Sequence, residues 1–174
     1  MASQLLEWFE QDAIPRFTSW NKQNPVADPV QNRRFRPDFA FVGGDGVVLL
    51  EYDEHMHQDY SRRCELVRMA EVGVGYHGRP VHWVRFNPDA FKVAGITRRT
   101  DKTERHAVLK TVLEAALALP DYENLITVDY VCYDKPIAGP PGSSDLVQTL
   151  RFRDYEAYCA WAEEVAPAAA QGPA

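Results

Sequence analysis

Carboxylates and histidines are concentrated around two short apolar runs in the chain. Asp38 precedes the first run, and Glu51 and Asp53 come at the end of the second. His55 and His57 follow a few residues later. Carboxylates that lie close together raise one another's pKa unless a cation sits among them, and their oxygens suit Mg²⁺ or Mn²⁺. These residues therefore predict a divalent metal site, with a solvated strand end as the alternative.

A histidine beside such a site could take a proton from a metal-bound water, because its side chain titrates near neutral pH. Several acids around a metal together with such a base form a hydrolytic centre. His57 is the candidate base and His55 is its competitor. If the chain stays extended beyond Glu51, both histidines lie on the metal-facing side, so strand alternation cannot separate them.

The apolar runs predict the strands that position these acids. Residues 39–41 and 47–50 read as two strands, and the Gly-rich residues 43–46 between them predict a hairpin turn. Side chains alternate between the faces of a strand, so Glu51 and Asp53 should point the same way and Tyr52 the opposite way. The reversal at the turn can bring Asp38 alongside them.

The later part of the chain predicts an α/β protein. A helix from about residue 62 to 72 precedes a strand at 80–86, which together with the preceding strand indicates a right-handed parallel crossover. Helical spacing of apolar residues also predicts helices at 3–14, 103–119 and 154–165. A further strand is expected at 125–133, and loops at 20–31, 89–101 and 135–144.

Length and composition indicate a globular chain. Its 174 residues fit one domain at 1–166, followed by a flexible tail at 167–174. No apolar run is long enough for a bilayer, and the N-terminus lacks the features of a signal peptide. Three widely spaced cysteines suggest reduced thiols with small buried side chains. We therefore expect an intracellular protein, located in the cytoplasm or with the nucleoid or nucleus.

The net charge of −6 argues against tight, nonspecific binding of nucleic acid, because phosphate affinity comes largely from Lys and Arg. The basic residues are nevertheless grouped, and a local positive face can operate on an acidic protein. Arg36, Arg62 and Arg63 are the candidates to face phosphate groups. For any one basic group, a solvated surface explains the sequence equally well.

The ordered set of these motifs resembles the PD-(D/E)xK nuclease superfamily. It is most similar to the branch with very-short-patch-repair endonucleases and EDxHD homing endonucleases. The resemblance covers residues 35–89, and the usual lysine is absent because Asp53 stands at its position. The motifs that carry it are Pro37-Asp38-Phe39, then Glu51-x-Asp53-Glu54-x-x-His57 with Asp59, then Val84-Arg85-Phe86-Asn87-Pro88-Asp89.

The resemblance implies a restriction-endonuclease-like α/β fold, with a mixed central sheet flanked by helices, and Mg²⁺- or Mn²⁺-dependent cleavage of DNA. Asp38 and Glu51 would hold the metal, with Asp53 in or beside its ligand set. His57 would replace the lysine, with Asp59 as an orienting carboxylate. Glu7, on the first predicted helix, is a candidate further metal ligand. A homodimer is compatible with the resemblance.

Two alternatives remain open. A structural zinc could be built from His55, His57 and Cys64 with His77 or His82, although structural zinc sites usually have closely spaced Cys and His ligands. The fold could also carry a catalytically inactive module that binds nucleic acid or protein. The acidic charge and the missing lysine support that second alternative.

Overall fold

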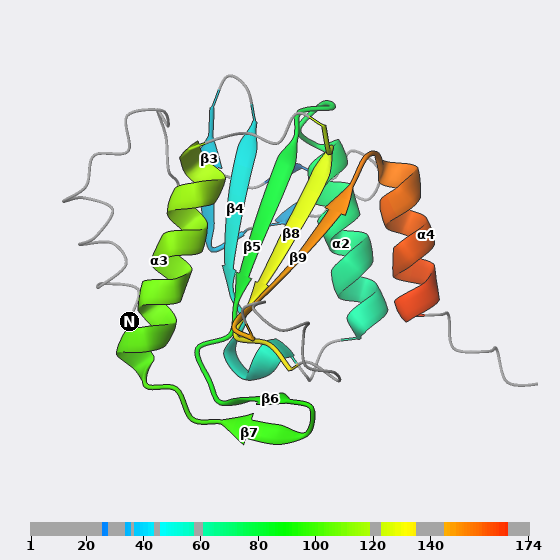
Figure 1. Ribbon diagram of the computed structural model, residues 1–174. Helices are drawn as coiled ribbons and strands as arrows, with labels where there is room; N and C mark the ends of the chain where they lie inside the picture. The colour runs from blue at the N-terminus through cyan, green and yellow to red at the C-terminus, as the bar shows by residue number, and fades with distance from the viewer. Residues whose placement is uncertain are drawn as a thin grey trace, which may run out of the picture.

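The computed structural model describes residues 26–27, 34–35, 37–43, 46–57, 61–118, 123–134 and 145–166. A five-stranded sheet lies in the middle, with helices on both of its faces (Figure 1). The expected α/β class with a mixed central sheet flanked by helices is therefore confirmed.

The sheet has the order β3-β4-β5-β8-β9. Its two edge strands run antiparallel to their neighbours, whereas β4, β5 and β8 are parallel to one another. The predicted hairpin and the predicted parallel pairing are both confirmed. The strands span Phe39–Val42 (β3), Val47–Tyr52 (β4), Val81–Phe86 (β5), Ile126–Val131 (β8) and Val147–Phe152 (β9).

Three α-helices cover the sheet in the described part of the chain. They are α2 (Arg62–Val74), α3 (Lys102–Ala118) and α4 (Tyr155–Val165). Figure 1 shows α3 on one face of the sheet, and α2 and α4 side by side on the other. All three confirm predicted helices to within two residues at each end. Asp154 caps α4, because its carboxylate accepts a hydrogen bond of 2.8 Å from the Ala157 amide.

The core is divided by the sheet into two apolar layers. Leu49 and Trp83 pack with Tyr158 in the layer beneath α2 and α4. Leu50 and Phe86 pack in the layer beneath α3. Adjacent residues of one strand thus enter opposite layers, which explains why β4 reads as a continuous apolar run.

Several short elements differ from the sequence expectations. Residues expected as loop form the hairpin of β6 (Phe91–Val93) and β7 (Ile96–Arg98). β9 was not predicted, because half of its side chains are exposed at the sheet edge and its sequence gives no apolar alternation. A two-residue strand, β1 (Val26–Ala27), lies in the expected loop 20–31 and pairs with β2 (Arg34–Phe35).

The expectation of an extended chain beyond Glu51 holds only as far as Tyr52. Glu54–His57 form a 3₁₀ helix, η1, in which the Met56 amide donates to the Asp53 carbonyl at 3.0 Å. Met56 has a positive φ of 55°, which ends any strand-like alternation. The assumption of an extended chain, from which strand alternation placed His55 and His57 on one side, is therefore wrong.

The cysteines also differ in part from expectation. All three are free thiols, as predicted, but only Cys132 is buried. Cys64 and Cys159 are exposed on α2 and α4. Among the described helices, none is long and apolar enough to cross a membrane.

Some predictions fall outside the described residues. They concern Glu7, Arg36 and Asp59, the helix at 3–14, the loop at 135–144, and the tail at 167–174. The backbone of His55 and His57 is described, but their side chains are not. The predicted division into one domain and a tail remains a prediction.

The close packing of α2 on α4 depends on Gly73. A Cβ atom there would lie 2.5 Å from the Tyr155 hydroxyl oxygen and 2.9 Å from its Cε1. Overpacking of this kind typically costs about 1–3 kcal/mol, more than the ~1 kcal/mol that Ala gains over Gly in a helix. We expect Gly73→Ala to lower the free energy of unfolding measured in urea.

Tyr155→Phe is the matched control, because the buried hydroxyl has no hydrogen-bond partner in the described structure. Alone it should leave stability near wild type, and combined with Gly73→Ala it should restore part of the loss. A Gly73→Ala protein as stable as wild type would contradict this packing.

Candidate functional site

Asp38 lies just before the start of β3, next to the end of β4, where Glu51 and Asp53 lie. The β3–β4 register pairs Phe39 with Leu50, so Asp38 and Glu51 are the next positions along the two strands. Asp38 Oδ2 accepts a hydrogen bond of 2.8 Å from the Tyr52 amide. The structure therefore places the first predicted acid beside the second, as the sequence suggested.

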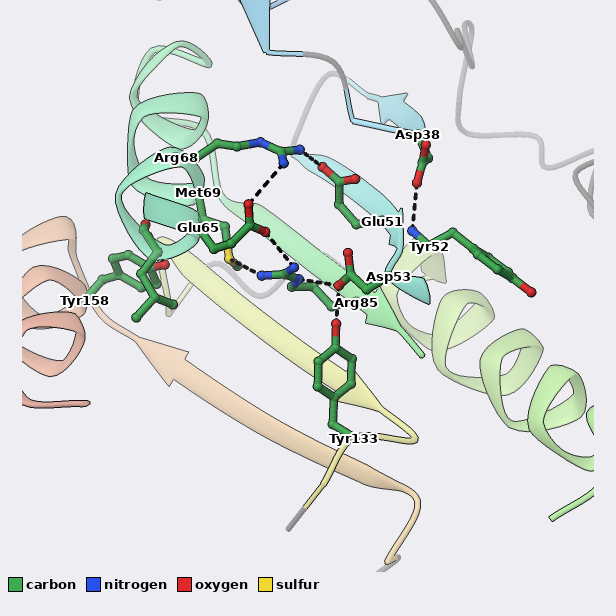
Figure 2. A network of polar contacts seen from close by, with 11 residues as sticks. Asp38, Glu51, Tyr52, Asp53, Glu65, Arg68, Met69, Arg85, Tyr133 and Tyr158 are labelled. Carbon is green, nitrogen blue, oxygen red and sulfur yellow. Dashed lines mark hydrogen bonds and ion pairs between the residues drawn. The ribbon is translucent and has the colours of Figure 1, made fainter. Parts of the chain in front are cut away.

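The predicted alternation along β4 is confirmed at this end. Tyr52 packs its ring on Phe86 in the α3 layer, with ring centroids 5.2 Å apart. Glu51 and Asp53 point to the opposite face, where both reach arginine side chains (Figure 2).

Glu51 is a buried carboxylate whose charged form is unfavourable. Glu51 is only 5 % exposed, and its carboxylate pairs with the Arg68 guanidinium from α2. Burial raises the pKa of Glu51 to about 8; Arg68 lowers it, while Asp38 and Asp53 raise it further. The arginine therefore offsets only part of the cost of placing this charge here.

Asp53 is held by a different arginine. Arg85, on β5, donates through Nε to Asp53 Oδ2 at 2.6 Å, and the Tyr133 hydroxyl donates to the same oxygen. Both members of the ion pair are buried. Burial also raises the pKa of Tyr133, so its hydroxyl remains a donor at neutral pH. The residue at the expected lysine position thus fixes a buried cation.

Glu65 of α2 joins the two arginines. Its Oε2 accepts from Arg85 Nη2 at 2.8 Å, and its Oε1 lies 3.6 Å from Arg68 Nη1. Figure 2 shows the resulting order of alternating charges between α2 and the sheet. We call it the charge chain; it consists of Glu51, Arg68, Glu65, Arg85 and Asp53.

Acidic side chains are close together at this end of the sheet. Besides Glu51, Glu65 and Asp53 in the charge chain, Asp38 lies next to Glu51 in the strand register. Burial is the main cause of the raised pKa of Glu51, and Asp38 and Asp53 add to it. A divalent cation would favour the ionised form of Glu51, and carboxylate oxygens are suitable ligands for Mg²⁺.

The three predicted ligands do not form a ready ligand set. No group of three or more His, Cys, Asp or Glu side chains in the described part of the chain is arranged to hold a metal. Asp38 bonds a backbone amide, Glu51 bonds Arg68, and Asp53 bonds Arg85. Metal binding at this place would require Glu51 to exchange its arginine partner for the cation.

Two of the predicted phosphate-facing arginines, Arg62 and Arg63, are exposed at the start of α2. Arg62 borders a cavity that Arg85 also lines. Arg63 instead borders an apolar groove between α2 and α4. Of these two, Arg62 therefore shares a cavity with a member of the charge chain.

The zinc alternative gains no support from the described residues. His82 bonds Asp129 at 2.7 Å on β8, and Cys64 is an exposed side chain on α2. No zinc-type ligand group is assembled within the described ranges.

Sequence reasoning missed the partners of the acids: Glu65, Arg68, Arg85 and Tyr133. Two signals were present. Arg85 is a charged residue inside an apolar strand, where a charge requires a partner. Glu65 and Arg68 are three residues apart on one helix and so share a face.

Comparison of the chain with protein-family models, with curated proteins and with solved structures gave no match. The relationship to PD-(D/E)xK nucleases therefore stays a prediction that rests on the motifs within residues 35–89.

The raised pKa of Glu51 predicts how stability depends on pH. Between the ordinary value of 4.5 and about 8, the unfolded chain loses this proton while the folded protein keeps it. Folding then becomes less favourable as pH rises through this window. We expect Glu51→Gln to flatten the decline in the free energy of unfolding between pH 5 and 8, measured by urea titration without metal.

Glu114→Gln is the control, because it removes one carboxylate from an exposed ion pair with Lys110 on α3. It should retain the wild-type slope. A Glu51→Gln protein with the same pH slope as wild type would show that Glu51 ionises normally in the folded state.

Proposed function

We propose that the chain is a divalent-metal-dependent DNA endonuclease with a restriction-endonuclease-like fold. The main support is the buried Glu51 carboxylate, which lies next to Asp38 in the strand register and whose pKa burial raises to about 8. A cation would stabilise the ionised form of a buried carboxylate that has other acids close by. The mixed sheet and the order of its first strands agree with the fold that the motifs imply.

Asp38 and Glu51 are the residues that would hold the metal, with Asp53 beside them. A bound Mg²⁺ or Mn²⁺ would stabilise charge on the phosphate and lower the pKa of a bound water. Asp53 would keep its hydrogen bonds to Arg85 and Tyr133 in this arrangement. These bonds would hold its carboxylate in place beside the metal ligands.

The remaining roles belong to side chains of the chain itself. His57 would accept the proton of the attacking water, because Asp53 stands at the usual lysine position. Arg62 would attract the DNA phosphates at the exposed start of α2, with Arg36 and Arg63 as further candidates. Because the pKa of Glu51 is raised, a cation would compete with a proton for its carboxylate, so metal affinity should rise with pH.

The inactive binding module remains the second candidate. One observation favours it: Asp53, at the expected lysine position, is fully buried and engaged by Arg85 and Tyr133. A protein of that kind would bind its partner equally well with and without divalent metal.

Cleavage of plasmid and oligonucleotide DNA with Mg²⁺, Mn²⁺ or EDTA tests the proposal. Wild type should cut only with metal, and Asp38→Asn and Glu51→Gln should abolish cutting and most of the Mn²⁺ binding seen by calorimetry. His57→Ala should lose at least ~10²-fold in rate, the low end for a general base, with metal binding and melting temperature near wild type.

His55→Ala is the matched control and should lose much less activity than His57→Ala. Wild-type cutting by His57→Ala, or an inactive His55→Ala, would overturn the assignment of the base. Equal Mn²⁺ binding by wild type, Asp38→Asn and Glu51→Gln would overturn the metal site. A wild-type protein that cuts no DNA under any of these conditions would favour the inactive module.

A further inference from the structure

A cavity of about 360 Å³ opens beside the charge chain, on the side of the sheet that α2 and α4 cover. Its buried part is formed by Arg85 and Leu66, and its wall includes Tyr133. Arg85 and Tyr133 are also the two residues that bond Asp53. The cavity is therefore lined by side chains that bond one of the proposed catalytic carboxylates. Its volume is at the small end of the range for ligand sites.

Three aromatic residues, Tyr130, Tyr133 and Trp161, form part of the wall of this cavity. Tyr130 and Tyr133 lie edge to face, with centroids 5.0 Å apart and planes at 71°. Trp161 of α4 is half-buried on the same cavity. Arg85 sits with its guanidinium carbon 6.0 Å from the Tyr130 centroid. Rings of this kind provide flat surfaces on which a nucleobase can stack.

The charges around the cavity distinguish its interior from its mouth. Inside, the positive charge of Arg85 is already balanced by Asp53 and Glu65 at 2.6 and 2.8 Å. An anion would gain little there. At the mouth Arg62 and Asp134 are both exposed, so the rim carries one charge of each sign. The interior thus favours a neutral planar group, and Arg62 is the side chain at the rim that can attract its phosphate.

Gln148 supplies a polar group that could select such a ring. It is exposed on β9, opposite Tyr130 in the strand register, and borders the cavity. Its amide offers both donors and an acceptor, which match the hydrogen-bonding edge of a base.

We propose that this cavity receives one unpaired nucleobase of single-stranded DNA, next to the bond that the carboxylates cleave. The proposal rests on the proposed nuclease function and names its substrate class. A base inside a duplex cannot reach a pocket of this kind without being extruded, which costs a few kcal/mol of stacking and pairing. Single-stranded or locally unpaired DNA avoids that cost.

Binding of an oligonucleotide with one 2-aminopurine, in EDTA so that no cleavage occurs, tests the proposal. Fluorescence anisotropy reports affinity, and quenching of the 2-aminopurine reports stacking. We expect the single strand to bind at least 10-fold more tightly than the duplex, with its fluorescence quenched. Trp161→Leu and Tyr130→Leu should each weaken single-strand binding about 5- to 100-fold and reduce the quenching, while duplex binding stays unchanged.

Tyr76→Leu is the matched aromatic control. Tyr76 follows α2 in the turn before β5, at the opposite end of the sheet, and should leave binding unchanged. Gln148→Ala changes an exposed side chain, so it tests the cavity even if an aromatic variant fails to fold. It should weaken single-strand binding and leave the melting temperature near wild type.

The outcomes separate this proposal from the nuclease proposal. Equal affinity for single strand and duplex, or wild-type binding and quenching by Trp161→Leu, Tyr130→Leu and Gln148→Ala, would overturn the base pocket even if the protein cuts DNA. Quenched single-strand binding that the pocket variants lose would support the pocket even if no cleavage occurs. Absence of any DNA binding in EDTA would overturn the base pocket, whereas the nuclease proposal is decided by the cleavage assay with metal.

Discussion

Burial of several charges between α2 and the sheet is the constraint on which the rest of this structure depends. Glu51 and Asp53 leave β4 on the helix side, and each needs a cation there. Arg68 and Arg85 supply these cations, and Glu65 joins them. Removing one member of a buried pair typically costs about 3–5 kcal/mol, because its partner is left without compensation. The charge chain therefore fixes how α2 lies on the sheet.

The topology creates this concentration of charge. An antiparallel hairpin places the start of β3 next to the end of β4, and the parallel pairing of β4 with β5 places Arg85 beside Glu51. The crossover helix α2 then covers the same end and contributes Glu65 and Arg68. Protonation removes the cost of burying a charged Glu51 carboxylate, which is why burial raises its pKa. A divalent cation would instead favour the ionised form.

The sequence predicted the features that arise from local pattern, and few of those that depend on tertiary pairing. Apolar runs and glycines were sufficient to predict the β3–β4 hairpin and β5. They also predicted that Glu51 and Asp53 lie on one face of β4. The same alternation failed after Tyr52, because a hydrogen bond from Met56 turns the chain into η1. The Arg85–Asp53 bond joins residues 32 positions apart, so no spacing rule reveals it. The exposed β9 gave no apolar alternation to read.

The ionisation of Glu51 with and without a divalent cation tests the central claim most directly. Its carboxyl carbon can be followed by ¹³C NMR as pH is raised, first in EDTA and then with saturating Mg²⁺. Our interpretation predicts a pKa near 8 without metal. With Mg²⁺ the pKa should fall below the ordinary value of 4.5, because the cation favours the ionised form. A raised pKa that Mg²⁺ leaves unchanged, or an ordinary pKa in EDTA, would contradict it.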